Sequence, residues 1–256
     1  MYETGTGVPG NLVKAFEYYA ASDTELQRID GSDGIWIRYR DGKALNHTRA
    51  EQKSRFEAAA NAGSPIAKYH LAQFYLNEKE RKADSGKAVT LLEEAAFAGY
   101  SKAEFMLGTL YRDGKHVQKS DSLAVQWLTA AAEQGHSGAQ NDLGNAYSAG
   151  VGVLKDFGKA AELYKKAAAQ GRKEAQYNLA RSYLKGNGVP RDVVLAYAYL
   201  NLSAAAGIKD GESIRNSLEG ALKPLEISEA QRLSRNWKPG TVLEREVWKV
   251  TKIWPI

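Results

Sequence analysis

Small and hydrophobic residues recur along this chain at a fixed interval of 36 positions. Alanine-rich segments end at glycines that stand one interval apart: Gly63, Gly99, Gly135, Gly171 and Gly207. Tyrosines and leucines keep the same interval, at Tyr39, Tyr75, Tyr111, Tyr147 and Tyr183 and at Leu71, Leu107, Leu143 and Leu179. A period of this length predicts a stack of repeats, because one repeat cannot bury its hydrophobic face without a neighbour.

The first half of each repeat has the spacing of a helix. A small residue, a leucine, a second small residue and a tyrosine stand at offsets 0, 4, 5 and 8, as in Ala139, Leu143, Gly144 and Tyr147. These offsets lie on one face of a helix with 3.6 residues per turn. We expect this face to pack inward, and the small residue at its centre to let another helix approach closely.

The second half of each repeat is expected to be a helix with a recognisable residue at both ends. Residues suited to the N-cap fall in one column: Thr48, Asp84, Ser120, Asp156 and Asp192. The oxygen of such a side chain accepts a hydrogen bond from the first turn and stabilises the helix by about 1 kcal/mol. The periodic glycine then ends the helix in the left-handed conformation. Each repeat is therefore predicted to be a hairpin of two helices.

The pattern A-x-x-x-L-[GA]-x-x-Y, followed by G-x-G-V and a late A-A-x-x-G, resembles the Sel-one-like repeat (SLR), a relative of the tetratricopeptide (TPR) repeat. The TPR period is 34 residues, whereas the period here is 36. The resemblance implies an all-α fold: a right-handed α/α superhelical solenoid of about five and a half 36-residue helix-turn-helix repeats with C-terminal capping helices. It also implies a bacterial protein that acts as an adaptor and has no shared chemistry.

The expected organisation follows from these columns. It comprises a partial first repeat at 1–27 whose first helix is missing, a divergent repeat at 28–63, repeats at 64–99, 100–135, 136–171 and 172–207, capping helices at 208–239 and a tail at 240–256. Because Tyr2 stands in the tyrosine column, most of the first helix of the first repeat would precede Met1. We expect a trimmed start or an internal methionine taken as the start; the alternative is a natural half-repeat that serves as a cap.

The divergent repeat departs from the pattern in two ways. Gly31 and Gly34 weaken its first helix by up to about 1 kcal/mol each. Trp36 stands where other repeats have Gly108 and Gly144, at the position of close helix approach. Trp36 is therefore either a specialised contact site or the result of repeat decay.

The tail admits two interpretations. Leu243, Val247, Val250 and Trp254 have the spacing of a helical stripe, although an alternation that includes Trp248 also suits a strand. The tail either covers the open end of the last hairpin or docks a partner. We favour covering, because an exposed hydrophobic end invites association.

Composition narrows the class of partner. The net charge of +5 comes from 35 basic and 30 acidic residues that alternate along the chain, which is typical of a solvated surface rather than a nucleic-acid footprint. No apolar stretch is long enough to span a membrane. The absence of cysteine leaves the compartment open, either periplasmic or cytoplasmic. We predict a protein or peptide partner, no nucleic acid and no membrane span, with the oligomeric state unknown.

One motif suggests a dinucleotide site and is rejected. Gly5, Gly7 and Gly10 have the G-x-G-x-x-G spacing, but too few residues precede them for the strand that such a site needs. The first two glycines recur as Gly150 and Gly152, so the motif is expected to be a turn between helices. We predict no cofactor.

Candidate chemistry is otherwise scarce. The four histidines are His47, His70, His116 and His136, and none has the spacing of a metal or catalytic pair. We expect all four to be surface or turn residues, and the protein to be no enzyme, with no catalytic residues and no metal ligands.

A binding surface is expected on the first helices instead. Offsets 2, 6 and 9 oppose the packing face, which in TPR-like solenoids lines the concave groove. The predicted groove residues are Tyr69, Gln73, Phe105, Thr109, Arg112, Asn141, Asn145, Tyr177 and Arg181. Their aromatic, arginine and amide side chains are those of an interface. A solvated face, or aromatics that fill gaps between repeats, are the alternatives.

The predicted function is a non-enzymatic adaptor or scaffold that binds a partner protein or peptide in this groove. The resemblance implies roles such as regulation or immunity to a secreted toxin. The alternative is a cell-wall-ligand binder or a β-lactam-hydrolysing enzyme like the cysteine-rich branch of the family. This chain lacks the paired cysteines of that branch.

Overall fold

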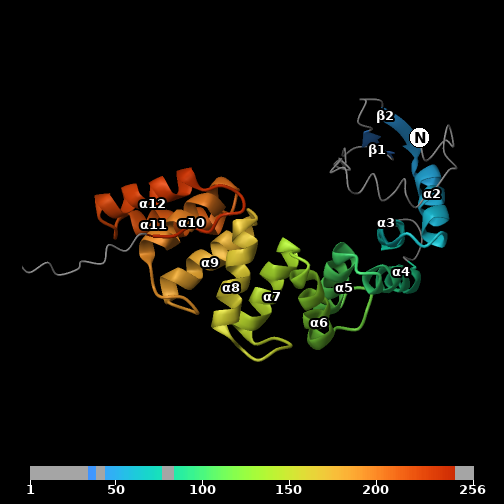
Figure 1. The fold of residues 1–256 in the computed structure, drawn as a ribbon, viewed down its shortest axis with the longest axis horizontal. Coiled ribbons are helices and arrows are strands. Elements are labelled where there is room, and N and C mark those ends of the chain that lie inside the picture. Colours follow the sequence, from blue (N-terminus) through green and yellow to red (C-terminus); the bar gives the residue numbers. More distant parts are fainter. Residues whose placement is uncertain (1–33, 39–43, 77–83, 246–256) are drawn as a thin grey trace, which may run out of the picture. The chain divides into compact units, whose positions relative to one another are not determined.

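The computed structural model describes residues 34–38, 44–76 and 84–245, with side chains from Lys53 onward. The elements are β1 (Gly34–Arg38), β2 (Ala44–Thr48), α2 (Arg49–Asn61), α3 (Pro65–Leu76), α4 (Ser85–Phe97), α5 (Ser101–Asp113), α6 (Asp121–Glu133), α7 (Ser137–Ala149), α8 (Phe157–Ala169), α9 (Lys173–Lys185), α10 (Val193–Ala205), α11 (Lys209–Glu219) and α12 (Pro224–Asn236) (Figure 1). The opening glycine motif, the partial repeat at 1–27 and the tail from residue 246 lie outside the described residues.

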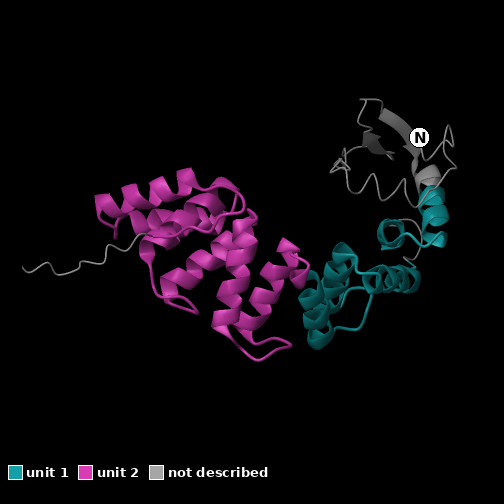
Figure 2. Ribbon diagram, in the orientation of Figure 1, with its two compact units in different colours: residues 1–131 teal, residues 132–256 magenta. Residues whose placement is uncertain are grey.

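The chain divides into two compact units, which are described separately (Figure 2). Unit 1 covers residues 1–131 and unit 2 covers residues 132–256. In both units consecutive helices pack as hairpins, so the predicted class of helical repeat solenoid is confirmed. Each repeat from residue 64 to residue 207 supplies two helices, as its periodicity predicts.

The predicted packing face forms the core of each repeat. In unit 1, Ala67, Leu71 and Ala72 are buried between α3 and its neighbours. In unit 2, a Cβ atom added at Gly144 would lie 2.6 Å from the ring of Tyr164 on α8. Only glycine allows α7 and α8 to approach this closely, which confirms the role predicted for the small residue.

The predicted helix ends are confirmed wherever side chains are described. Asp84 accepts a hydrogen bond from the amide of Lys87 at 3.2 Å, and Asp192 accepts two at 3.0 Å from the first turn of α10. Asp156 and Ser120 form equivalent caps at 3.0 and 3.3 Å. All five periodic glycines have positive φ angles: Gly63 95°, Gly99 81°, Gly135 85°, Gly171 85° and Gly207 90°.

The tyrosine column closes each hairpin through its backbone. The amides of the cap residues donate to tyrosine carbonyls on the first helix: Ser120 to Tyr111 at 3.0 Å, Asp156 to Tyr147 at 3.0 Å and Asp192 to Tyr183 at 3.1 Å. The same hydrogen bond therefore fixes the loop in three successive repeats. Because buried backbone groups need partners, this bond keeps the length of the loop constant from one repeat to the next.

Residues 34–48 differ from the expectation for the divergent repeat. The sequence columns place a first helix across Trp36, but the backbone forms an antiparallel hairpin of β1 and β2 in which Trp36 pairs with Asn46. The expectation of a helix is therefore wrong here. The segment Ile35–Ile37 is rich in residues that favour strands, and Gly34 is unfavourable within a helix. The side chain of Trp36 lies outside the described residues.

Two further helices follow the last repeat, as expected for residues 208–239. Both α11 and α12 pack against α10 (Figure 1). Residues 237–245, which we call the C-terminal strap, then return across unit 2 without helical structure. Residues 243–245, where the predicted stripe begins, are not helical, and Val247, Val250 and Trp254 lie outside the described residues.

The C-terminal strap is fixed at several points along its length. The amide of Gly240 donates to the carbonyl of Ala169 at 2.7 Å, and the amide of Leu243 donates to the hydroxyl of Tyr199 at 2.9 Å. Leu243 is buried in the core of unit 2. Arg245 forms two hydrogen bonds of 3.1 Å with Glu229 and an ion pair of 3.7 Å with Asp192. These contacts favour the covering role for residues 240–245.

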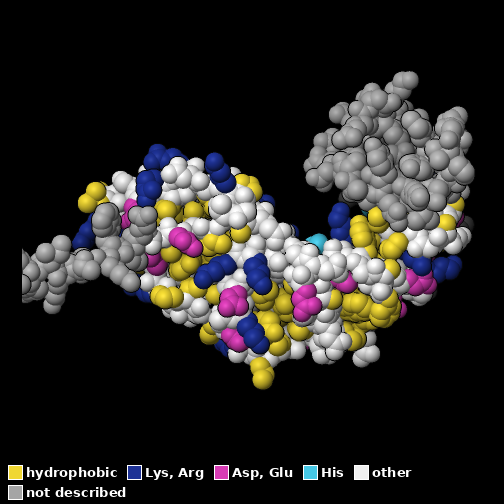
Figure 3. Space-filling view, in the orientation of Figure 1, with side chains coloured by type: hydrophobic (Ala, Val, Ile, Leu, Met, Phe, Trp, Pro, Cys, Tyr) yellow, Lys and Arg dark blue, Asp and Glu magenta, His cyan; other side chains and the backbone are white. Residues whose placement is uncertain are grey.

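Charges of both signs are interspersed over the surface, as Figure 3 shows for one face. This agrees with the alternation of charges along the sequence. Among the helices that the structure describes, none has the length and apolar character needed to cross a membrane.

Candidate functional site

In unit 2, the predicted groove residues of α7 are joined by a side chain of α9. The amide of Asn178 donates to Asn141 Oδ1 at 3.0 Å and to Asn145 Oδ1 at 3.1 Å. The hydroxyl of Tyr164 on α8 donates to the same oxygen of Asn145 at 2.8 Å. Three helices thus hold one another through a single polar network.

Members of this network differ in exposure. Asn141 is only 3% exposed, so the expectation that it lies on an open groove surface is wrong. Its side chain is a buried member of the network. Asn145 is exposed, as predicted. Tyr164 is buried, and burial raises the pKa of its hydroxyl to about 12. Tyr164 therefore stays protonated and acts as a hydrogen-bond donor throughout the physiological range.

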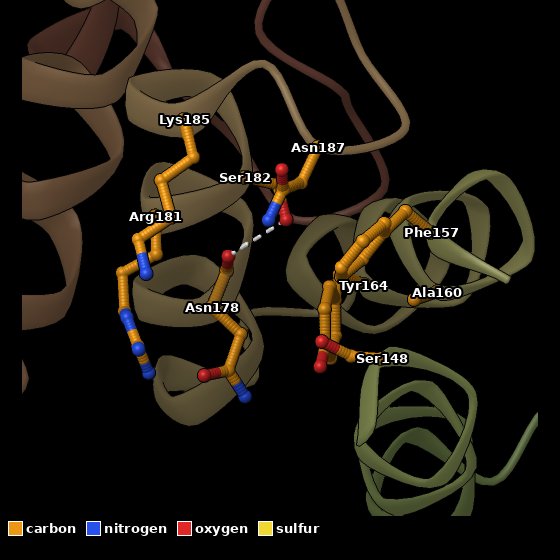
Figure 4. A pocket seen from close by; sticks show the side chains of 9 residues that line it. All are labelled: Ser148, Phe157, Ala160, Tyr164, Asn178, Arg181, Ser182, Lys185 and Asn187. Carbon is orange, nitrogen blue, oxygen red and sulfur yellow. Dashed lines mark hydrogen bonds between the residues drawn. The ribbon is translucent and has the colours of Figure 1, made fainter. Parts of the chain in front are cut away.

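A hollow of about 80 Å³ opens beside this network and is called the polar pocket here (Figure 4). Its lining residues are Ser148, Phe157, Ala160, Tyr164, Asn178, Arg181, Ser182, Lys185 and Asn187. Figure 4 shows Arg181 and Lys185 on one side of the hollow and the rings of Tyr164 and Phe157 on the other. The pocket is therefore formed where two successive repeats meet.

The lining has a positive charge. Arg181 and Lys185 are both exposed, and neither forms an ion pair with any carboxylate in the described parts of the chain. The guanidinium of Arg181 lies 5.7 Å from the ring centre of Tyr177, its neighbour one turn earlier. Tyr177 and Arg181, both predicted for the groove, thus lie together, and the ring favours the cation.

The size of the polar pocket limits its chemistry. Pockets that enclose small-molecule substrates measure about 300–1,000 Å³, whereas this hollow measures about 80 Å³. Among the described residues, no group of His, Cys, Asp and Glu is placed to hold a metal ion. The polar pocket suits one side-chain group of a larger partner better than a free substrate.

In unit 1, the structure brings Tyr69 and Gln73 together. The side-chain amide of Gln73 donates to the Tyr69 hydroxyl at 3.1 Å. The Tyr69 ring packs edge-on against Tyr100, with ring centres 5.3 Å apart, and burial raises the pKa of its hydroxyl. Tyr69 is therefore half-buried and contacts a ring of the next repeat. This agrees with the alternative that aromatic residues fill gaps between repeats.

The groove residues of α5 are only partly exposed. The hydroxyl of Thr109 donates to the carbonyl of Phe105 at 3.0 Å, and Arg112 forms an ion pair of 2.8 Å with Asp113. Neither bond joins α5 to another helix. Phe105, Thr109 and Arg112 therefore lie on one face of α5 and are each partly exposed.

His70 contradicts the expectation that every histidine is a surface or turn residue. Its ring is partly buried, stacks on Phe56 with ring centres 5.2 Å apart, and lies 3.1 Å from Gln73 Oε1 through Nδ1. Burial lowers the pKa of His70 to about 4, and the positive charge of Lys102 lowers it further, although the hydrogen bond with Gln73 opposes this shift. His70 is thus a neutral packing residue of unit 1.

Acidification is expected to weaken unit 1 through His70. The unfolded chain takes up a proton near pH 6.5, whereas folded His70 does so only near pH 4. The unfolded state binds more protons between these values, so the stabilisation is present above pH 6.5 and is lost as the pH falls toward 4. We expect a loss of about 2 kcal/mol, allowing for partial exposure. Urea unfolding at several pH values measures it.

The matched comparison uses two histidine variants. His70→Gln removes the titrating group and should flatten the dependence of stability on pH relative to the wild type. His116→Asn changes an exposed turn histidine with a φ of 66° and serves as the control for the loss of one histidine. Equal slopes for the wild type and His70→Gln would contradict the assignment.

Two other histidines behave as predicted. His116 lies in the exposed turn after α5, and its Nδ1 forms a hydrogen bond of 2.9 Å with the hydroxyl of Ser85. His136 precedes α7, where its Nδ1 accepts from the amide of Ala139 at 3.2 Å. The side chain of His47 lies outside the described residues.

Sequence reasoning missed Asn178, Tyr164 and Lys185. Asn178 stands at offset 3 of its helix, beside the predicted groove offsets but outside them. Tyr164 belongs to a second helix, whereas the groove offsets apply only to first helices. The close approach predicted at Gly144 was the one signal that could have pointed to a large partner such as Tyr164 on α8.

Comparison with known families gives a consistent result. The family model of the Sel1 repeat, which is the Sel-one-like repeat, matches residues 1–22, 65–100, 101–136, 137–171 and 173–208, or more than half of the chain. The matches leave out residues 23–64, which include β1 and β2. None of the curated proteins matches the chain.

Several solved structures are similar. A Sel1 repeat protein from Oxalobacter formigenes is 24% identical, with a TM-score of 0.67 over 89% of this chain and 89% of that one. A protective antigen of uropathogenic Escherichia coli with an SLR fold is 26% identical, with a TM-score of 0.54 over 93% of this chain and 58% of that one. An immunity protein from Pseudomonas aeruginosa is 18% identical, with a TM-score of 0.48 over 88% and 82%. The first two show the same solenoid fold.

Proposed function

Because the chain belongs to the Sel1 repeat family, we propose that it is a non-enzymatic scaffold that binds a partner protein or extended peptide on the exposed faces of its first helices. Sel1 repeat proteins are generally protein-interaction scaffolds. The faces concerned are those of α3 and α5 in unit 1 and of α7 and α9 in unit 2.

The observation that carries the proposal is the polar network of unit 2. Hydrogen bonds from Asn178 and Tyr164 hold Asn145 at the surface in one position. Side chains that are already ordered lose less conformational entropy when they bind, which favours recognition of a partner. The neighbouring polar pocket is too small for an ordinary substrate and supports binding rather than turnover.

Regulation of a partner, or protection against a secreted toxin, is the finer role that we propose. In either role the partner would be a folded protein or an extended segment that lies along α7 and α9. Such a partner would bury Asn145, whose side-chain amide can hydrogen-bond a backbone, and Arg181, a residue type enriched at interfaces.

Affinity capture from a lysate of the source organism tests this proposal. The bait variant Phe105→Ala/Arg112→Ala/Asn145→Ala changes three side chains on first helices, none of them fully buried. We expect it to lose a protein that the intact chain retains, because removal of central interface side chains commonly costs about 2 kcal/mol each. Bound proteins are identified by mass spectrometry, and circular dichroism checks that helicity is retained.

A matched variant alters second helices instead. Gln126→Ala/Glu162→Ala/Lys166→Ala changes three exposed residues of α6 and α8 and should retain the partner. A partner lost from this control and retained by the first-helix variant would place binding on the opposite helices and contradict the proposal. Capture of no protein by the intact chain would count against a scaffold role.

A further inference from the structure

We propose that the polar pocket of unit 2 is a carboxylate-binding subsite that takes an aspartate or glutamate side chain of the partner. This inference rests on the proposed function, because it assigns the chemistry of the segment that lies over α7, α8 and α9. It concerns Arg181, Lys185 and Asn187, whose side chains form no hydrogen bond or ion pair with the other described residues.

Charge gives the first argument. The lining includes two cations, Arg181 and Lys185, and no carboxylate. Neither cation forms an ion pair with a carboxylate of the described residues. Asp142 is the acidic residue that acts on Tyr164, and its effect on the pKa of Tyr164 is smaller than that of Arg181. The potential in the pocket is therefore positive.

Hydrogen-bond donors give the second argument. The hydroxyl of Ser182 donates to the carbonyl of Asn178 at 3.1 Å, and the hydroxyl of Tyr164 donates to Asn145 at 2.8 Å, so both are committed within the protein. The guanidinium of Arg181, the ammonium of Lys185 and the side-chain amide of Asn187 remain as donors at the rim. A carboxylate accepts from a guanidinium through two parallel bonds, and bonds to charged groups are about twice as strong as neutral ones.

Size gives the third argument. The hollow of about 80 Å³ equals roughly two to three waters, at about 30 Å³ each. This space suits one carboxylate and its last methylene group, whereas an aromatic side chain would not enter. The rings of Phe157 and Tyr164 form the apolar wall beside which that methylene would lie (Figure 4).

Position gives the last argument. The subsite lies beside Asn145, the exposed amide of the same network, so an extended segment on α7 could meet both. Asn145 would bond the backbone of the segment while Arg181 and Lys185 bind one acidic side chain. The subsite would therefore recognise one acidic side chain at a fixed position in the segment, rather than the overall charge of the segment.

Fluorescence anisotropy of the full chain with a synthetic peptide tests the inference. The probe is a fluorescein-labelled octapeptide of alternating alanine and glutamate, and its comparison is the same peptide with glutamine in place of glutamate. We expect the glutamate peptide to bind at least about 10-fold more tightly than the glutamine peptide. The double variant Arg181→Gln/Lys185→Gln should lose that preference.

A charge-matched variant separates the subsite from general attraction. Lys166→Gln/Arg232→Gln also removes one lysine and one arginine, both exposed on α8 and α12, and should keep the preference within about 2-fold. Equal losses in the two double variants would overturn the inference, because attraction would then depend on net charge alone. A phosphoserine peptide that binds while the glutamate peptide does not would overturn the carboxylate assignment.

The outcomes for the subsite and for the scaffold role can be told apart. A partner captured through the first helices, with no preference for the glutamate peptide, would support the scaffold role and overturn the carboxylate subsite. A preference for the glutamate peptide that depends on Arg181 and Lys185, with no protein captured, would support the subsite and count against the scaffold.

Discussion

The Gly188→Ala variant is expected to be less stable than the wild type by about 3 to 4 kcal/mol. A Cβ atom at this position would lie 1.9 Å from the carbonyl oxygen of Phe157 and 2.3 Å from its carbon. Both atoms belong to the backbone at the start of α8, so no side-chain rotation can relieve the overlap. Gly188 also has a φ of 72°, a conformation that alanine rarely adopts. The loop between α9 and α10 would have to move away from α8.

Urea unfolding followed by circular dichroism measures this loss, with Gly220→Ala as the control. Gly220 follows α11 with a φ of −74°, and no atom lies within 4 Å of an added Cβ. Alanine there should be neutral or stabilising by up to about 1 kcal/mol. Similar stabilities for Gly188→Ala and the wild type would show that the loop between α9 and α10 does not contact α8 in solution.

The second large effect is expected in the C-terminal strap. Leu243→Ala should destabilise unit 2 by about 3 kcal/mol, the usual cost of truncating a buried leucine. Leu243 is only 6% exposed and packs in the core of unit 2. Its amide also donates to the buried hydroxyl of Tyr199, which would lose a fixed partner if the strap detached. Thermal unfolding followed by calorimetry measures the change.

Leu225→Ala is the control for this prediction. Leu225 is 84% exposed near the start of α12, so the same truncation removes almost no buried surface there. It should change stability by less than about 0.5 kcal/mol. Equal effects of the two leucine variants would mean that the strap does not cover unit 2 as described.

The repeat columns explain why so much of the fold could be predicted from sequence. Each column corresponds to a local requirement: a cap oxygen as at Asp156, a positive φ as at Gly171, or a close approach as at Gly144. A requirement met by one residue type at one backbone position is visible in a single sequence. It is even clearer when the sequence repeats it every 36 residues.

Features that occur once were predicted poorly. The hairpin of β1 and β2 replaces a helix, because strand-forming residues around Trp36 prevailed over the register of the repeat. The burial of His70 and the network around Asn178 depend on side chains from neighbouring helices. Such contacts have no periodic signature. The handedness of the solenoid and the absence of nucleic-acid binding stay predictions.

The candidate site illustrates the same division. Offsets counted along one helix correctly placed Asn145 and Arg181 at the surface, since exposure follows from the helical period. The pocket beside them needs α8 and the loop at Asn187 as well, and its volume depends on how far apart the helices lie. Spacing within one helix cannot supply that distance.

The C-terminal strap also limits how this array could lengthen during evolution. Its contacts reach Ala169 on α8, Tyr199 on α10 and Glu229 on α12, so it spans two successive repeats. A duplicated 36-residue gene segment inserted ahead of α7 would leave all of these contacts in place. The same duplication after Gly207 would separate α10 from α11, α12 and the strap. We therefore expect the number of repeats to vary ahead of α7 without any change in the contacts of the C-terminal strap.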